Sequence, residues 1–420
     1  MAGPVARSAF AERTNRPRSL FLTDSGCPPV VNNYYTLRAL VHEWRPDLHG
    51  TTVRDIYSQN KNELTVALEG GDRKWMVRGS VQRPFLYLFR RPGYHKARRN
   101  VATLFEDASG QDVADVSIAE RDRLVSIELA DGSRLLWQMF GARANAFHVA
   151  PDGTIAAAFQ RHDELTGTAA PEPYPAPMPE TFGAFEERWT TNRNKTRQAV
   201  QSAVSLFGAD LARETMHRAG VATEAPEDCS EEERRALFDA SMALRDALGD
   251  PDPVIYGAGQ FPDAFSLIPL RHRADEPAER PDTVDAAVSD FVRRTLAEQH
   301  FHRLYDPLEE ALESAAEHER RSAERMVEEL QSESRAGRYE RWGHLLMAQQ
   351  DQVPDGAEEV ELPDLFEDGA PVTIPVDPAK SPVENAEHYY DRARSTRRSR
   401  EEAEGRLDDT IERAERAEAL

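Results

Sequence analysis

Turn residues separate runs of alternating apolar and polar residues within residues 63–153, and this pattern is the strongest constraint on the fold. Gly70-Gly71-Asp72, Asp131-Gly132 and Pro151-Asp152-Gly153 lie between such runs. Alternation with a period of two is typical of strands with one buried face, and turns between such strands favour antiparallel neighbours. The sequence therefore predicts an antiparallel sheet that forms a sandwich or curls on itself.

One strong helix precedes this sheet. Asn32 or Asn33 can cap its start, because a side-chain oxygen there can accept from a free backbone N–H. The apolar residues that share one helical face are Leu37, Leu40, Val41 and Trp44. Helix and sheet together predict an α+β domain. Five prolines in residues 171–179 indicate a stiff, extended boundary behind it.

Helix dominates the chain beyond this boundary. Two helices meet around Gly208, and the second of them ends at Gly220. Ser230 and Glu233 form a capping box that begins a third helix. A short hairpin is expected within residues 252–270.

A long polar helix is expected to begin at Asp306-Pro307 and to break at Gly337, with apolar residues at the spacing of a coiled-coil arm. A small unit with two strands follows, and a second capping box of Ser381 and Glu384 begins the last helix. The expected divisions are a disordered tail at 1–28, then 29–185, 186–290, a first arm at 291–337, a small middle domain at 338–380 and a second arm at 381–420.

Composition limits the partners and the setting of the chain. Its formal net charge of −22 makes the average surface repel nucleic acid. Two cysteines, Cys27 and Cys229, are too few for a disulfide framework or a four-thiolate zinc site. No apolar run suggests a membrane span, and the first thirty residues lack the apolar core of a secretory signal. We therefore expect a cytoplasmic protein with no membrane partner.

One window departs from this acidic charge. Residues 73–105 hold nine Lys or Arg and no Asp or Glu. We call them the acid-free window. Cations there alternate with the aromatic residues Phe85, Tyr87, Phe89 and Tyr94. Guanidinium groups bind phosphates bidentately, and aromatic rings offer faces to unpaired bases. Two interpretations stay open, a nucleic-acid face or a strand with core aromatics and ordinary surface arginines.

Enzyme signatures are absent from the sequence. It contains no GxSxG, HExxH, P-loop or CxxC pattern, and the glycines of "YGAGQ" indicate a plain turn. His300 and His302 are spaced too closely to share a helix face. We therefore expect no catalytic residue, no metal and no cofactor. Gly208 leaves backbone N–H groups free for a phosphate, although a simple helical hairpin explains it equally well.

Several separated segments together resemble the NFACT family. These ribosome quality-control factors include bacterial RqcH and eukaryotic NEMF, and in bacteria they are often labelled fibronectin-binding A proteins. The segments are "VNNYYTLRALVHEW", "LHGTTVRDIYSQNKNELTVAL", "YHKARRNVATLF", "GARANAFHVAPDG", "YERWGHLLMA" and "TIPVDPAKSPVENAEHYYDRA". The resemblance runs from about residue 29 to the end and is most specific at Ile374–Tyr390.

The resemblance implies a fold and a set of RNA-binding residues. The N-terminal domain would be similar to that of formamidopyrimidine-DNA glycosylases, followed by a helix-hairpin-helix domain and an antiparallel coiled coil with a small middle domain. RqcH-like members need an Asp-Arg pair to engage tRNA, and their Gly-x-x-x-Asn turn matches Gly141–Asn145 here. The expected RNA-binding residues are Asp122, Arg123, Arg143, Asn145, Arg90, Arg91, Lys96, Arg98 and Arg99, with Gly208 as the phosphate seat.

The chain also departs from the family pattern. RqcH-like proteins carry an Arg-Lys-His run where this chain has Phe105-Glu106-Asp107, and their Gly-Arg-His-Ser-Asn turn is "GARAN" here. Both changes weaken the expectation of alanine selection, and the cations Lys96, Arg98 and Arg99 are candidates to compensate. The resemblance does not extend to the family's C-terminal RNA-binding domain. Two explanations stay open: the chain is a shortened form, or that domain lies on another polypeptide.

The function implied by the resemblance is non-enzymatic. Such a factor would bind the large ribosomal subunit and its RNA when a peptidyl-tRNA obstructs it, and would recruit tRNA for template-free tailing of the nascent chain. Tailing of this type usually adds alanine, so alanyl-tRNA is the candidate partner. Two alternatives are an interaction scaffold or adhesin and a glycosylase-type enzyme. The second alternative needs an N-terminal proline nucleophile, whereas the chain begins Met-Ala-Gly.

Overall fold

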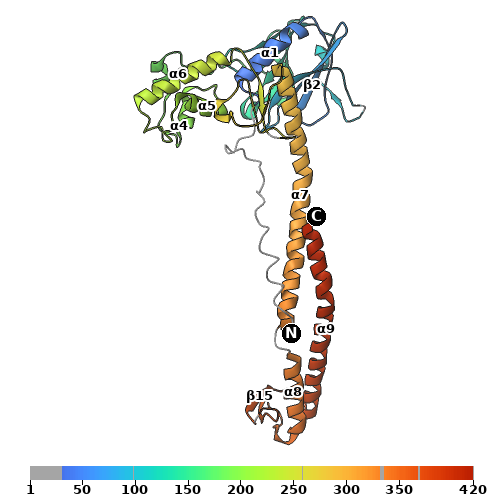
Figure 1. Ribbon diagram of the computed structural model, residues 1–420. Helices are drawn as coiled ribbons and strands as arrows, with labels where there is room; N and C mark the ends of the chain where they lie inside the picture. The colour runs from blue at the N-terminus through green and yellow to red at the C-terminus, as the bar shows by residue number, and fades with distance from the viewer. Residues whose placement is uncertain (1–30, 98, 258, 332–334, 368, 420) are drawn as a thin grey trace. The chain divides into compact units, whose positions relative to one another are not determined.

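The computed structural model describes residues 31–97, 99–257, 259–331, 335–367 and 369–419 (Figure 1). The chain divides into two compact units, the first ending at Glu298 and the second beginning at Gln299. Antiparallel sheets in the first unit combine with helices in both, which confirms the α+β class. The disordered tail expected at residues 1–28 lies outside the described residues.

Two five-stranded antiparallel sheets form the first part of the chain. Sheet one has the order β4-β3-β2-β1-β5, with strands β1 (Thr52–Ser58), β2 (Glu63–Gly70), β3 (Arg73–Ser80), β4 (Tyr87–Pro92) and β5 (Ala102–Thr103). Sheet two has the order β10-β9-β8-β7-β6, with strands β6 (Val113–Ile118), β7 (Leu124–Leu129), β8 (Arg134–Gln138), β9 (Asn145–Val149) and β10 (Ile155–Ala158). The expected antiparallel pairing is thus confirmed, because most strands pair with their neighbours in sequence.

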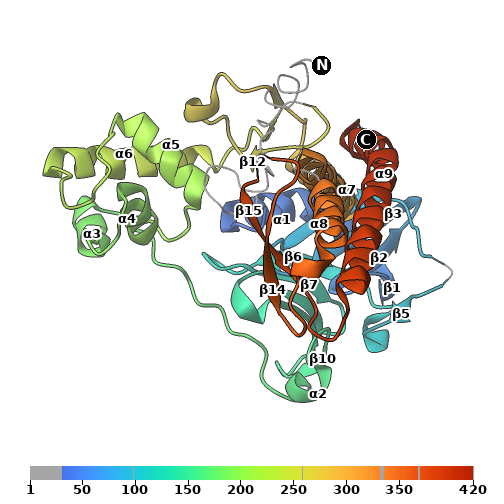
Figure 2. The same cartoon turned by 90° about the horizontal axis from the view of Figure 1, so that it is seen from below.

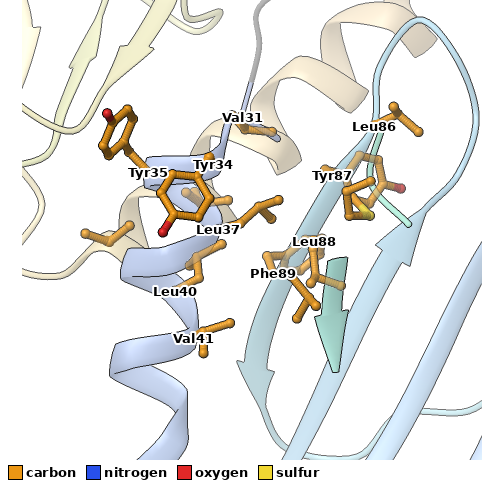
Figure 3. Packing of buried hydrophobic residues seen from close by; sticks show 14 of the residues in the cluster. Val31, Tyr34, Tyr35, Leu37, Leu40, Val41, Leu86, Tyr87, Leu88 and Phe89 are labelled. Carbon is orange, nitrogen blue, oxygen red and sulfur yellow. The ribbon is translucent and has the colours of Figure 1, made fainter. Parts of the chain in front are cut away.

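Helix α1 (Tyr34–Leu48) begins at the predicted cap. The side chain of Asn33 accepts a hydrogen bond from the N–H of Thr36 at 2.9 Å. Asn32 has another role, because its amide donates to the carbonyl of Met139 at 2.8 Å. Figure 3 shows the apolar face of α1 beside Leu88 and Phe89 of β4, and all of these residues belong to one buried cluster.

The helices that follow share the core of the sheets. After the short α2 (His162–Leu165) come α3 (Phe182–Arg188), α4 (Thr196–Ala203), α5 (Ala209–Ala219) and α6 (Glu231–Ala247). Gly220 ends α5 in the left-handed conformation, and both hydrogen bonds of the Ser230–Glu233 capping box are present. A small sheet of order β12-β11-β13 follows, with β11 (Val254–Tyr256), β12 (Ala264–Ser266) and β13 (Ala278–Glu279). One apolar cluster extends from Val31 to Val292 and includes residues of both large sheets, of α3 to α6, and of β11 and β12.

Helix α7 (Val284–Gln331) begins earlier than the sequence predicts. The expected start at Asp306-Pro307 is wrong, because Pro307 lies inside the helix. The true start is capped by a residue far away in the chain. Glu43 of α1 accepts from the N–H groups of Val284 and Asp285, both at 2.8 Å. A carboxylate at a helix N-terminus satisfies donors that have no partner within the helix.

The second unit consists of helices and one small sheet (Figure 2). Beyond α7 it contains α8 (Arg335–Ala348), the antiparallel strands β14 (Glu359–Pro363) and β15 (Pro371–Pro375), and α9 (Pro382–Ala419). The break expected at Gly337 is wrong, because this residue lies within α8. Packing of α8 on α9 outweighs the low helix propensity of glycine. Gly343 shows how close the two helices are, since a Cβ there would lie 2.9 Å from the ring of Tyr390.

Short 3₁₀ turns connect several of these elements. Two lie in the first part of the chain, η1 (Glu106–Ala108) and η2 (Gly141–Arg143), and two lie later, η3 (Arg271–Arg273) and η4 (Gln350–Gln352). The capping box of Ser381 and Glu384 is present at the start of α9. Within the described residues, no helix is long and apolar enough to cross a membrane.

Candidate nucleic-acid interface

The aromatic residues of the acid-free window belong mostly to the core. Phe85, Tyr87 and Phe89 are buried, and their neighbouring rings lie 5.4 and 5.8 Å apart between centroids. Tyr94 lies beyond the strand, is 37% exposed and donates to Asp55 at 3.3 Å. The interpretation of the three buried rings as stacking faces for bases is therefore wrong. They are the core aromatics of the strand alternative.

Five of the nine cations in the window are neutralised by carboxylates outside it. The ion pairs are Arg73–Asp47, Lys74–Glu69, Arg78–Glu63, Arg90–Asp47, Arg90–Asp285 and Lys96–Asp55. These carboxylates come from α1, β1, β2 and α7. The positive charge of these five window cations is therefore compensated by carboxylates on neighbouring elements of the fold. This removes Lys96 as a free RNA-binding cation.

Arg90 forms the most enclosed of these pairs. Its side chain is 8% exposed and lies over the ring of Trp75, 4.1 Å from the centroid. Its nitrogens lie 3.2 Å from Asp285 and 2.9 Å from Asp47, and Trp44 donates to Asp285 at 2.8 Å. Burial raises the pKa of Asp285 above its ordinary value, and the charge of Arg90 opposes this. The expected RNA-binding role of Arg90 is corrected here, because the buried guanidinium joins β4 to α1 and α7.

Asn145 also has a structural position. It is buried, and its amide donates to the carbonyl of Gln160 at 2.9 Å. Its oxygen accepts from the N–H groups of Ala146 and Gln160, both at 2.9 Å. All of these bonds are internal, so Asn145 fixes the η2 turn against the end of β10 and is removed from the RNA-contacting set.

Three further predicted RNA-binding residues, Arg91, Arg99 and Gly208, are exposed to solvent. Arg91 and Arg99 are exposed, whereas Arg98 lies outside the described residues. Gly208 is exposed and caps α5 with an extended backbone and no side-chain hydrogen bond. Its phosphate-binding role stays a prediction.

The remaining candidates meet at one end of sheet two. Leu124, Gln138 and Asn145 are in register on β7, β8 and β9. Arg123 therefore stands just before β7, at the same end as the η2 turn with Arg143. The carbonyl of Arg123 accepts from the N–H of Met139 at 2.9 Å, which ties the two loops together. We call this end of the sheet, with Arg123, Arg143 and their surroundings, the arginine edge.

Asp122 organises the backbone of the arginine edge. It is buried, and one carboxylate oxygen accepts from the N–H of Arg123 at 2.7 Å. The other oxygen accepts from the N–H of Tyr174 at 2.8 Å. A carboxylate used in this way positions other groups, so Asp122 attaches the Pro-rich segment to the start of β7.

Neither arginine of the edge forms an ion pair within the described residues, although Asp122 lies next to Arg123 in the chain. The guanidinium of Arg123 lies 5.4 Å from the ring centroid of Phe140, and burial lowers its pKa while the charge of Asp122 opposes this. Arg143 is exposed in the η2 turn, which begins at Gly141 with a φ of +65°. No ion pair of either guanidinium is found in the described parts of the chain. A half-buried cation that forms no ion pair favours binding of an anion.

Tyr174 is a residue of the edge that sequence reasoning missed. It is 82% exposed and sits on the Pro-rich segment, which the sequence identifies only as a boundary. A tyrosine among prolines carries no binding signal, and only the hydrogen bond to Asp122 places it beside Arg123.

Three residues at which the chain departs from the family pattern, Phe105, Glu106 and Asp107, lie at the η1 turn. Phe105 is buried in a left-handed conformation, with its ring 6.2 Å from that of His148. Glu106 and Asp107 lie in the η1 turn. Among the described residues, no group of three or more His, Cys, Asp or Glu is placed to hold a metal ion.

Two five-stranded antiparallel sheets characterise the first unit, and one end of sheet two forms the arginine edge. A family model described as "NFACT N-terminal and middle domains" matches residues 33–420. The chain therefore belongs to the NFACT family. No curated protein matches it significantly.

Three solved structures similar to the chain have names that refer to binding of fibrinogen or fibronectin. The fibrinogen binding protein from Staphylococcus aureus is 13% identical, with a TM-score of 0.49, over 61% of this chain and 97% of that one. The N-terminal part of the fibronectin/fibrinogen-binding protein from Streptococcus suis is 13% identical, with a TM-score of 0.45, over 62% and 98%. The N-terminal domain of fibronectin-binding protein PavA from Streptococcus pneumoniae is 17% identical, with a TM-score of 0.36, over 64% and 99%.

Proposed function

We propose that the chain is a cytoplasmic, non-enzymatic factor of ribosome quality control. It binds tRNA and the large ribosomal subunit obstructed by a peptidyl-tRNA, and it recruits tRNA for template-free, alanine-type tailing of the nascent chain. Membership of the NFACT family supports this role. The observation that carries it is the arginine edge, where Arg123 and Arg143 lie at one end of sheet two and form no ion pair among the described residues.

The arrangement suits binding to the RNA backbone. A guanidinium group can donate two parallel hydrogen bonds to a phosphate. Arg123 is held against Phe140, so little side-chain entropy is lost when it binds. Asp122 fixes the loop that carries Arg123 through its hydrogen bond to the backbone. The peptide bond forms on the ribosome, so these residues bind and orient RNA without a covalent step.

The alternative of an interaction scaffold or adhesin gives these arginines no role. It would predict that their replacement leaves the bound partners unchanged. The fibrinogen- and fibronectin-binding names belong to the similar proteins, and we propose no such partner for this chain.

Recovery of the tagged protein from its own cells, with sequencing of the associated RNA, tests the proposal. We expect one or a few tRNAs together with large-subunit ribosomal RNA. The double variant Arg123→Ala/Arg143→Ala should lose the tRNA, because two phosphate contacts disappear. Arg73→Ala is the matched control, since its exposed side chain already pairs with Asp47 at 2.8 Å. Absence of RNA from the wild-type protein would contradict the proposal.

A further inference from the structure

The Pro-rich segment presents one large aromatic side chain to solvent. Tyr174 stands in the middle of the prolines Pro171, Pro173, Pro175, Pro177 and Pro179, and it is 82% exposed. Each proline ring fixes its own φ, so the segment is stiff even without regular secondary structure. The fold gives no reason for an exposed aromatic ring at this position.

Hydrogen bonds hold this segment against sheet two. The N–H of Tyr174 donates to Asp122 at 2.8 Å, and the N–H of Ala176 donates to the carbonyl of Arg121 at 2.8 Å. The segment is also anchored at its start, where the N–H of buried Ala170 donates to the carbonyl of Gly153 at 3.0 Å. The backbone of Tyr174 is thus ordered before any ligand binds, which lowers the entropic cost of binding.

The chemistry around Tyr174 selects among possible ligands. The hydrogen bond to Asp122 brings its backbone close to that of Arg123, whose guanidinium forms no ion pair among the described residues. An exposed aromatic ring and a cation on neighbouring segments suit a base and the phosphate attached to it.

We propose that Tyr174 is a stacking platform for an unpaired nucleobase of the RNA whose phosphates Arg123 and Arg143 bind. The inference rests on the proposed function and adds the class of RNA element that the site takes. Bases within a duplex already stack on one another, so only a loop, a bulge or a single-stranded end can place a base on the ring. The site therefore distinguishes unpaired from paired RNA without reading a particular base.

Binding of two RNA probes to the full chain tests this inference. One probe is a hairpin whose seven-nucleotide loop contains the fluorescent base 2-aminopurine, and the other is the same stem closed as a blunt duplex. Tyr174→Phe keeps the ring, whereas Tyr174→Leu keeps apolar bulk and removes the aromatic face. Phe366→Leu is the matched control, because Phe366 is 59% exposed in the second unit.

We expect Tyr174→Phe to bind the hairpin like the wild-type protein and to quench the fluorescent base. Tyr174→Leu should bind the hairpin about tenfold more weakly, without quenching, and should bind the duplex unchanged. Phe366→Leu should match the wild-type protein. Equal hairpin affinities for the wild-type protein and Tyr174→Leu would overturn the stacking role while leaving RNA binding intact. Equal losses in Tyr174→Phe and Tyr174→Leu would overturn it too, since the hydroxyl group would then matter. Failure of the wild-type protein to bind either RNA would overturn the proposed function itself.

Discussion

The acid-free window and the arginine edge are both regions in which arginine lies near aromatic residues, yet their arginines have different surroundings. In the window, Arg90 is enclosed between two carboxylates, and neighbouring cations pair with acids from other elements. At the edge, Arg123 and Arg143 have no such partners among the described residues. The comparison teaches that the density of cations along a sequence does not measure the charge that a surface offers to a ligand.

Sheet topology explains the difference. Neighbouring strands place residues far apart in sequence directly opposite each other, as Glu69 of β2 lies opposite Lys74 of β3. A cationic strand can therefore be neutralised by acids that lie outside any local window. The arginine edge lies before the start of β7 and after the end of β8, outside the strand pairing that sets Glu69 opposite Lys74.

The largest expected effect concerns the buried pair of the window. Asp285→Ala should lower the free energy of unfolding by about 3–5 kcal/mol, because Arg90 and the indole N–H of Trp44 would lose a buried acceptor. Urea denaturation of the variant measures this loss. Arg73→Ala, which breaks an exposed pair, should cost at most about 1 kcal/mol. Equal losses in both variants would contradict a buried structural role for Arg90.

A buried carboxylate outside both regions should dominate the response to acid. Glu214 is fully buried, and it accepts from Arg218 at 2.5 Å, from the N–H of Arg271 at 3.0 Å and from His272 at 2.8 Å. Burial alone would raise its pKa, but these hydrogen bonds outweigh burial and lower the pKa from 4.5 to about 2.

The sign of the pH effect follows from this lowered pKa. Stability from ionised Glu214 is fully present above about pH 4.5 and is lost as the pH falls towards 2, by roughly 3 kcal/mol in total. Glu214→Gln should flatten the stability curve over this range, which thermal unfolding between pH 5 and pH 2 would measure. Glu172→Gln, a change at an exposed position, is the control. An unchanged slope in Glu214→Gln would refute the assignment.

A smaller effect is expected at the arginine edge itself. Asp122→Asn should cost about 1–2 kcal/mol, because one of the two backbone N–H groups loses its charged acceptor. Hydrogen exchange should accelerate at the amides of Tyr174 and Ala176 and remain unchanged in the core strands. Protection of the Tyr174 amide that is unaffected by the change would show that Asp122 does not hold the Pro-rich segment.

The smallest effect is expected for the exposed cations of the window. Arg91→Ala/Arg99→Ala should change the free energy of unfolding by less than about 0.5 kcal/mol, because both side chains are exposed. The loss of RNA affinity should be smaller than for Arg123→Ala/Arg143→Ala. A larger loss in the window variant would move the RNA site from the edge to the window.

Local signals in the sequence predict much of the fold. Alternation and turn residues identify several strands of both sheets, and Asn33, Ser230 and Ser381 mark three helix starts. The start of α7 could not be predicted, because its cap is Glu43 on another helix. The break expected at Gly337 was wrong for a related reason. Packing of α8 stabilises the helix at a residue that usually interrupts one.

The candidate site was less predictable than the fold. Asp122, Arg123 and Arg143 follow from the family resemblance, and the register of β7, β8 and β9 brings them to one end of the sheet. The structural roles of Arg90 and Asn145 depend on partners far away in sequence or on burial, so no local pattern reports them. Tyr174 was also missed, because its hydrogen bond to Asp122 joins residues far apart in sequence.

The dependence of tRNA affinity on salt tests the central claim most directly. Affinity falls with salt in proportion to the number of phosphate contacts, so each lost contact reduces the slope of the logarithmic plot. We predict that Arg123→Ala/Arg143→Ala reduces the slope by about 1.5, and that Arg91→Ala/Arg99→Ala reduces it much less. A wild-type slope that is preserved in the edge variant, or reduced only in the window variant, would contradict the account.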